Sequence, residues 1–212
     1  MWYRSSNRMA TIRKQDEDHV AKELYNVLST TFPVDKPAPG FRGRPSEIPS
    51  IYPLSPLNCC DEVYPNIFVG DWSCAKNKPY LKRIGVTHVL NTAEGKLPGQ
   101  VDTDADYYRV ANIAYLGLPL CDLPVTNISK YFNVAADFIR DALLSGGKVL
   151  VHCMMGLSRS STCVIAYLML KEGMSASKAL HKVRSAREVR PNNGFLQQLA
   201  ELDVQLRRTR RF

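Results

Sequence analysis

The chain has 212 residues, of which 45% are hydrophobic and 23% are charged. This composition is close to the globular average and excludes a wholly disordered chain, and the length predicts one domain of roughly 150 residues with a further segment. Basic side chains exceed acidic ones by 28 − 20 = 8, which favours an anionic partner but does not choose among nucleic acid, a membrane surface and a small substrate.

Two patterns bear on where the protein works. The longest apolar run, residues 163–170, is shorter than the ~18 residues of a membrane span, and the N-terminus lacks the apolar segment of a secretory signal. The six cysteines form no C-x-x-C pair and no metal-ligand spacing with the four histidines. We therefore expect no metal ion, no membrane contact, and a reducing cytoplasmic or nuclear setting.

Residues 1–58 differ in composition from the rest. They hold seven of the 13 prolines, which favour an extended segment from Pro33 to Pro56. Before it, apolar residues at helical intervals, from Val20 to Leu28, follow the acidic run 16–18, which predicts an amphipathic helix with acids at its positive end. The helix either docks on the domain or binds a partner. We expect an arm of residues 1–58 and a folded domain of residues 59–212.

Strands and helices then alternate along the chain. Strands are expected at 66–70, 86–90, 113–118 and 148–151, and helices at 77–84, 129–144, 160–172, 175–187 and 193–207. The strand at 148–151 is continuously apolar, which is typical of a strand buried on both faces. The helix at 160–172 is apolar nearly all round and is expected to be central. This alternation predicts a layered α/β domain.

The segment between these two central elements carries the chemistry. A strand, a short loop and a helix place several backbone N–H groups at a helix N-terminus, where they form an anion site. Cys153 lies at the base of this loop, and both the helix terminus and the guanidinium of Arg159 favour its thiolate. Arg159 can bind two phosphate oxygens with its planar fork, and Gly156 permits the tight turn.

His152-Cys153-x5-Arg159 is the signature of the protein tyrosine phosphatase superfamily, and the chain resembles its VHR-like atypical dual-specificity phosphatases. The resemblance runs from about residue 58 to the C-terminus. It is carried by Glu62–Gly70, Gly85–Gly95, Val149–Met169 and Arg187–Leu199. It implies a central, mostly parallel, twisted sheet of about five strands flanked by helices, and it makes residues 59–212 a catalytic domain.

The resemblance also implies a two-step reaction with a cysteinyl-phosphate intermediate. Cys153 would attack phosphorus, while Arg159 and the N–H groups of residues 154–159 would hold the equatorial oxygens. His152 would orient the loop, and Ser160 would help the sulfur leave. The phosphate-binding residues are then Met154, Met155, Gly156, Leu157, Ser158 and Arg159. No metal ion or other cofactor is required, because arginine and amides supply the positive field.

Residues outside the loop are expected to complete the site. Asp122, 31 positions before Cys153, matches the place of the family's general acid, whereas the acids at 102, 104 and 106 are expected to be solvated. Arg187 matches a position that holds a second phosphate or an acidic substrate side chain. It would form a basic rim with Arg184 and Arg190, unless these belong to a solvated helix face. Asn192 is expected to support the loop. Whether Cys121 is a redox partner of Cys153 on oxidation is a hypothesis that the sequence leaves open.

The substrate expected from these features is a phosphorylated protein. The loop has no lysine of the kind that characterises inositol-lipid phosphatases, and MAP kinases are plausible substrates by family analogy alone. One alternative is a non-catalytic phosphoprotein-binding scaffold, although such relatives typically lack the cysteine or the arginine. Another is an RNA 5′-phosphatase, because residues 178–212 carry 9 basic and 3 acidic side chains. Aromatic residues for base stacking are not interleaved there, so we do not expect nucleic acid as the partner. A homodimer remains open.

Overall fold

The computed structural model describes residues 2–34 and 59–210. At its centre is a five-stranded sheet in the order β1-β2-β5-β3-β4. The strands are β1 (Cys60–Tyr64), β2 (Ile67–Gly70), β3 (His88–Asn91), β4 (Ala114–Gly117) and β5 (Val149–His152). β1 pairs antiparallel with β2, and the other three pairings are parallel. This mostly parallel sheet confirms the predicted fold class.

Alternation along the strands divides the apolar residues between two layers, because successive side chains of a strand point to opposite faces. Phe68, Val89 and Leu150 face one cluster, to which α2 (Trp72–Lys76), α3 (Lys78–Ile84) and α4 (Ala105–Arg109) contribute. Neighbouring strand residues such as Val69 and Val151 face the larger cluster. The helices of this second layer are α5 (Phe132–Leu144), α6 (Arg159–Leu170), α7 (Ala176–Arg184) and α8 (Asn193–Thr209), and a short 3₁₀ turn, η2 (Ser129–Tyr131), precedes α5.

β5 and α6 form the centre of the molecule, as their apolar patterns predict. All four residues of β5 are buried, and the strand lies between β2 and β3. Every residue of α6 from Arg159 to Met169 is buried. A strand and a helix held this firmly on all sides give the loop between them, residues 153–158, two fixed ends.

The N-terminal helix α1 (Trp2–Thr30) is longer than the sequence pattern predicts. Because it begins at Trp2, the acidic run 16–18 lies in its middle and not at its positive end, which corrects the predicted placement. There Glu17 pairs with Arg13 and Asp18 with Lys14, each one helical turn away.

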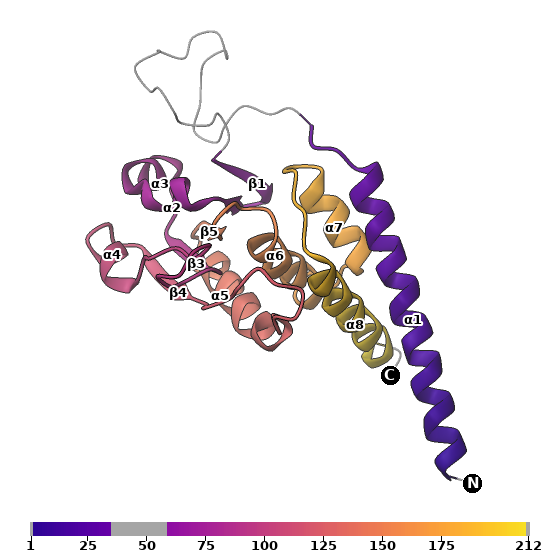
Figure 1. The fold of residues 1–212 in the computed structure, drawn as a ribbon. Coiled ribbons are helices and arrows are strands. Elements are labelled where there is room, and N and C mark those ends of the chain that lie inside the picture. Colours follow the sequence, from indigo (N-terminus) through magenta and orange to yellow (C-terminus); the bar gives the residue numbers. More distant parts are fainter. Residues whose placement is uncertain (1, 35–58, 211–212) are drawn as a thin grey trace.

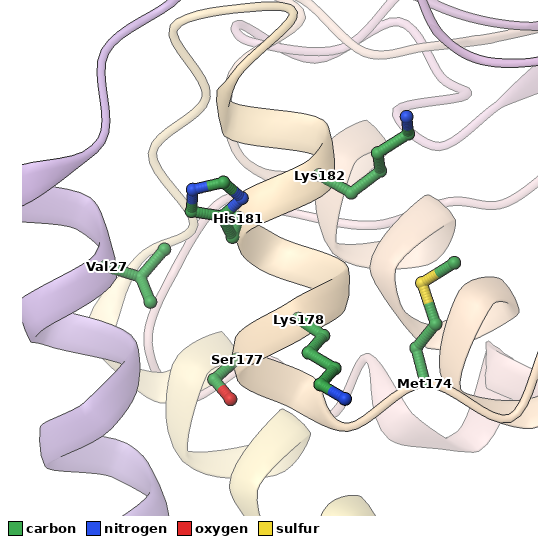
Figure 2. Close-up of a pocket in the computed structure, with 6 residues that line it drawn as sticks. All are labelled: Val27, Met174, Ser177, Lys178, His181 and Lys182. Carbon is green, nitrogen blue, oxygen red and sulfur yellow. The ribbon is translucent and has the colours of Figure 1, made fainter.

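α1 docks on the domain. This is one of the two interpretations that the sequence allowed for this amphipathic helix, the other being that it binds a partner. Leu24 is completely buried in the larger cluster, and α1 packs along α7 and α8 (Figure 1). The proline-rich segment falls almost entirely outside the described residues. A hollow of about 500 Å³ is lined by Val27 of α1, Met174 and one side of α7. Figure 2 shows these side chains, and none of the predicted site residues is among them.

The long predicted elements are present with shifts of a few residues at their ends. β1, α2 and α4 have no counterpart among the predicted elements, and each has only five residues. No helix in the described ranges is long and apolar enough to cross a bilayer.

Candidate active site

The site lies at the carboxyl end of β5, where parallel sheets commonly bind ligands. β5 ends at His152, α6 begins at Arg159, and Cys153 follows the strand directly. Cys153 is only 1% exposed and packs among Ala93, Val101 and Met154. The nucleophile predicted from the sequence therefore lies at the floor of a narrow loop.

Four carbonyl groups of the loop are bound by donors outside it. The Cys153 carbonyl is in contact with Nδ1 of His152, and the Met154 carbonyl accepts from the N–H of Trp72 at 3.1 Å. The remaining two belong to Gly156 and Leu157, with Arg187 Nε and the Arg190 N–H as their donors. All peptide bonds of the described residues are trans. Because the C=O and N–H of a trans peptide point in opposite directions, the N–H groups of residues 154, 155, 157 and 158 are directed toward the interior of the loop.

The sulfur of Cys153 accepts two hydrogen bonds from within this segment. The N–H of Gly156 lies 3.2 Å from Sγ, and the Ser160 hydroxyl lies 3.4 Å from it. Both donors favour a sulfur that carries negative charge. Gly156 makes the first bond possible because its φ is +68°, a conformation that costs little for glycine alone.

Hydrogen bonds from one nitrogen of its guanidinium hold Arg159 in place, and another nitrogen has no hydrogen-bond acceptor within the described residues. Its Nη1 donates to the carbonyls of Gly99 at 2.9 Å and Leu120 at 3.0 Å. The side chain is 5% exposed, and its Nε donates no hydrogen bond within the described residues. Nε lies 3.5 Å from a carboxylate oxygen of Asp122, which is an ion-pair distance. A buried donor without an acceptor costs free energy, so an oxyanion in the loop would stabilise Arg159.

Asp122 contacts the C-terminal end of the loop through Ser158 and Arg159, and its role as general acid stays a prediction. Its Oδ1 accepts hydrogen bonds from Ser158 Oγ and Asn192 Nδ2, both at 2.8 Å. The side chain is 34% exposed, so it is accessible to solvent. Asn192 also caps α8 by accepting from the N–H of Phe195, and this connection fixes the amide that orients Asp122. Asn192 is thus hydrogen-bonded to Asp122 and, through its own N–H, to Ser158 Oγ of the loop; its supporting role in the site stays a prediction.

His152 is completely buried, and burial lowers its pKa to about 4 although the contact of Nδ1 with the Cys153 carbonyl opposes this shift. The ring is therefore neutral at neutral pH, and Nδ1 carries the proton that it donates to that carbonyl. Nε2 has no hydrogen-bond partner within the described residues. His152 thus orients the peptide of Cys153 without adding a charge next to Arg159.

The predicted basic rim is not formed, and neither is a solvated helix face. Arg184 is 2% exposed and Arg187 is 9% exposed, while Arg190 lies at the surface. Arg187 pairs with Asp61 at 2.7 Å and donates from Nε to the Gly156 carbonyl at 3.0 Å. α7 ends at Arg184, so the chain turns inward where the sequence pattern continued the helix. Arg187 positions the loop that contains Cys153 by its bond to the Gly156 carbonyl, and its contact with substrate stays a prediction.

Several predicted or missed residues lie around this centre. Asp104 caps α4, and Asp106 pairs with Arg109, so neither belongs to the site. Cys121 is exposed and carries a free thiol, as does the buried Cys153, and their pairing on oxidation stays a prediction. Sequence reasoning missed Asp61, the partner of Arg187, because the two are 126 positions apart.

These features together define an α/β protein with a buried thiol at the floor of the loop that joins a central strand to a central helix. Residues 67–205 match the family described as dual specificity phosphatase, catalytic domain. The chain is 47% identical over 158 residues to dual specificity protein phosphatase 13B of Homo sapiens, which covers 74% of this chain and 79% of the relative.

Solved structures agree with this match. The structure of human DUSP28 has a TM-score of 0.62 and 30% identity, and the match covers 73% of this chain and 98% of that one. Human tyrosine phosphatase-like serine/threonine/tyrosine-interacting protein has a TM-score of 0.55 and 33% identity over 66% of this chain and 93% of its own. The chain belongs to the dual-specificity phosphatase family of protein phosphatases, which confirms the family predicted from the signature loop.

Proposed function

We propose that this phosphatase hydrolyses phosphotyrosine, and also phosphoserine and phosphothreonine, through a phosphocysteine intermediate on Cys153. The observation that carries the proposal is the arrangement of the loop. The buried sulfur of Cys153 accepts from the Gly156 N–H and the Ser160 hydroxyl, and Nε of Arg159 has no acceptor within the described residues. Arg159 and the N–H groups of the loop would bind the three equatorial oxygens of a transferring phosphoryl group, where transition-state charge lies.

In the first step the Cys153 thiolate attacks phosphorus, and the bond from phosphorus to the leaving oxygen breaks. Asp122 gives its proton to that oxygen, and its contact with Ser158 of the loop and its partial exposure support this role. In the second step water attacks phosphorus with Asp122 as base, and the sulfur leaves. Ser160, 3.4 Å from Sγ, donates to the departing thiolate.

The residues around the loop favour a protein as substrate. Met155 is 63% exposed and Leu123, beside the acid, is 53% exposed. These apolar side chains suit a peptide that flanks the phosphorylated residue, and no lysine in the loop is present to bind further phosphates of an inositol lipid. MAP kinases are candidates by family analogy alone. The six free cysteines support a reducing setting in cytoplasm or nucleus.

Aryl phosphate hydrolysis across pH tests the proposal with three proteins: wild type, Cys153→Ser and Asp122→Asn. We expect Cys153→Ser to be inactive while it still binds phosphate, because the N–H groups and Arg159 remain. Asp122→Asn should lose about 10²- to 10⁴-fold in kcat, and the limb of the pH profile that reports the acid should flatten. Activity that survives Cys153→Ser would rule out the proposed nucleophile.

The alternative functions give different results in the same assays. One structural relative is a phosphatase-like interacting protein, so a phosphoprotein-binding scaffold is a second candidate. A scaffold would bind phosphopeptides with no turnover in the wild type. An RNA 5′-phosphatase would release phosphate from a 5′-triphosphorylated oligonucleotide faster than from a phosphopeptide. We expect neither result, and trapping of phosphoproteins with the Cys153→Ser/Asp122→Asn variant should identify the substrates.

A further inference from the structure

Three cysteines outside the active site meet at one point beside β1. Cys59 lies at a bend directly before β1, Cys60 is the first residue of β1, and Cys74 lies in α2. Their three sulfur atoms lie within 4.8 Å of one another. Consecutive residues of a regular strand point to opposite faces, so the bend at Cys59 is what brings the adjacent thiols together.

The surrounding hydrogen bonds hold this geometry. The N–H of Asp71 donates to the Cys59 carbonyl at 3.0 Å, and the Asp71 carboxylate accepts from the N–H of Cys74 at 3.0 Å as the cap of α2. Cys60 and Cys74 are completely buried, whereas Cys59 is partly exposed. The cluster is therefore a built site with one side accessible to solvent.

The burial of the cluster limits what can occupy it. Two of its three thiols, those of Cys60 and Cys74, are completely buried. Several thiolates gathered in such a site are unfavourable unless a cation neutralises them. The close approach of the three sulfur atoms therefore suits a bound cation.

We propose that Cys59, Cys60 and Cys74 bind a thiophilic metal ion of the Zn²⁺ class, with water as its fourth ligand. Two thiolates bound at about 2.3 Å to one tetrahedral ion lie about 3.8 Å apart. The sulfur atoms of the three cysteines all lie within 4.8 Å of one another, so a small movement brings them to this separation. Soft sulfur ligands select Zn²⁺ over Mg²⁺ or Ca²⁺. On binding, three metal–sulfur bonds form, the thiol protons pass to solvent, and no atom is oxidised or reduced.

An ion at this site would fix two segments that hold the phosphate loop. Trp72, two residues before Cys74, donates its N–H to the Met154 carbonyl at 3.1 Å. Asp61, the neighbour of Cys60, pairs with Arg187. A ligand that binds only the folded state stabilises that state by mass action. The metal ion should therefore raise the melting temperature of the protein, and it should hold in place the segments of Trp72 and Asp61 that contact the loop and Arg187. This inference does not depend on the proposed function.

The test uses the untagged full chain with Cys153→Ser as background, so that the catalytic thiol cannot bind metal. Zn²⁺ is titrated against a chromophoric chelator in the presence of a phosphine reductant, and Co²⁺ is used for spectra. We expect one equivalent of Zn²⁺ and a sulfur-to-cobalt charge-transfer band with tetrahedral ligand-field bands. Adding Cys59→Ser should weaken Zn²⁺ binding at least tenfold, and adding the matched variant Cys121→Ser should leave it unchanged.

Cys59 and Cys121 are both accessible, so both variants are expected to fold, and melting curves of the metal-free proteins check this. The melting temperature should rise with Zn²⁺ in the background protein and in the Cys121→Ser variant but not in the Cys59→Ser variant. Three results would overturn the proposal: no bound Zn²⁺, equal Zn²⁺ affinity after Cys59→Ser, or a disulfide between two of the cluster cysteines in freshly isolated protein.

Discussion

A single methyl group added to the phosphate loop should displace the groups that bind phosphate. At Gly156 a Cβ would lie 2.5 Å from the Gly70 carbonyl oxygen, whereas ordinary contacts begin at 3.4 Å. The two backbones must therefore separate by 3.4 − 2.5 = 0.9 Å at this point. A displacement of about 1 Å in a catalytic arrangement costs on the order of 10²-fold in rate. We expect Gly156→Ala to lower kcat by about that factor.

Gly146→Ala is the matched control. Gly146 has a φ of +72°, close to the +68° of Gly156, but a Cβ there would meet nothing within 4 Å. Both variants carry the cost of a left-handed residue, about 1–2 kcal/mol of unfolding free energy. Overpacking adds about 1–3 kcal/mol at Gly156 alone. Urea unfolding and aryl phosphate kinetics measure both effects. Equal stability losses, or a kcat for Gly156→Ala within threefold of wild type, would refute this account of the loop.

Three further predictions concern residues around the loop. Arg187→Met removes the buried guanidinium that pairs with the Asp61 carboxylate and donates to the Gly156 carbonyl, and should cost about 3–5 kcal/mol of unfolding free energy. Arg190→Met at the surface should cost less than about 0.5 kcal/mol, and equal losses in urea unfolding would contradict the positioning role of Arg187. His152 takes up a proton below pH 6.5 when unfolded but only below about 4 when folded. The unfolded state therefore binds more protons in this window, and the free energy of unfolding should fall by about 3 kcal/mol as pH falls from 6.5 to 4. The difference from His152→Asn isolates this contribution, and parallel pH profiles of the two proteins would exclude it. Ser160→Ala should slow the second step, so a burst of aryl alcohol should precede slow turnover in rapid-mixing kinetics; a linear time course without a burst would argue against the role of Ser160.

The centre of the molecule could be predicted because its sequence patterns are local. Four apolar residues in a row suffice to bury β5, and an all-round apolar helix must be central. The spacing of His152, Cys153 and Arg159 is contained within that strand, loop and helix. The position of Asp122 followed from the family resemblance, and the structure brings it into contact with Ser158 of the loop.

What could not be predicted depends on contacts between distant segments. β1, α2 and α4 are too short to show a period, and packing against the sheet stabilises them. Arg187 looked like a surface charge because nothing near it in the sequence reveals its partner, Asp61. The cluster of Cys59, Cys60 and Cys74 could not be predicted for the same reason. Two of these cysteines are adjacent in the sequence and the third lies in α2, so their positions follow no regular metal-ligand spacing.

The most direct test of the proposed mechanism is to look for the covalent intermediate. The Ser160→Ala variant is mixed with aryl phosphate, quenched in acid within the burst, digested, and analysed by mass spectrometry under acidic conditions. The account predicts one phosphoryl group on the peptide that contains Cys153, at a level that matches the burst amplitude, and none in the Cys153→Ser/Ser160→Ala variant. A burst with no phosphoryl group on Cys153, or with the group on another residue, would contradict the central claim.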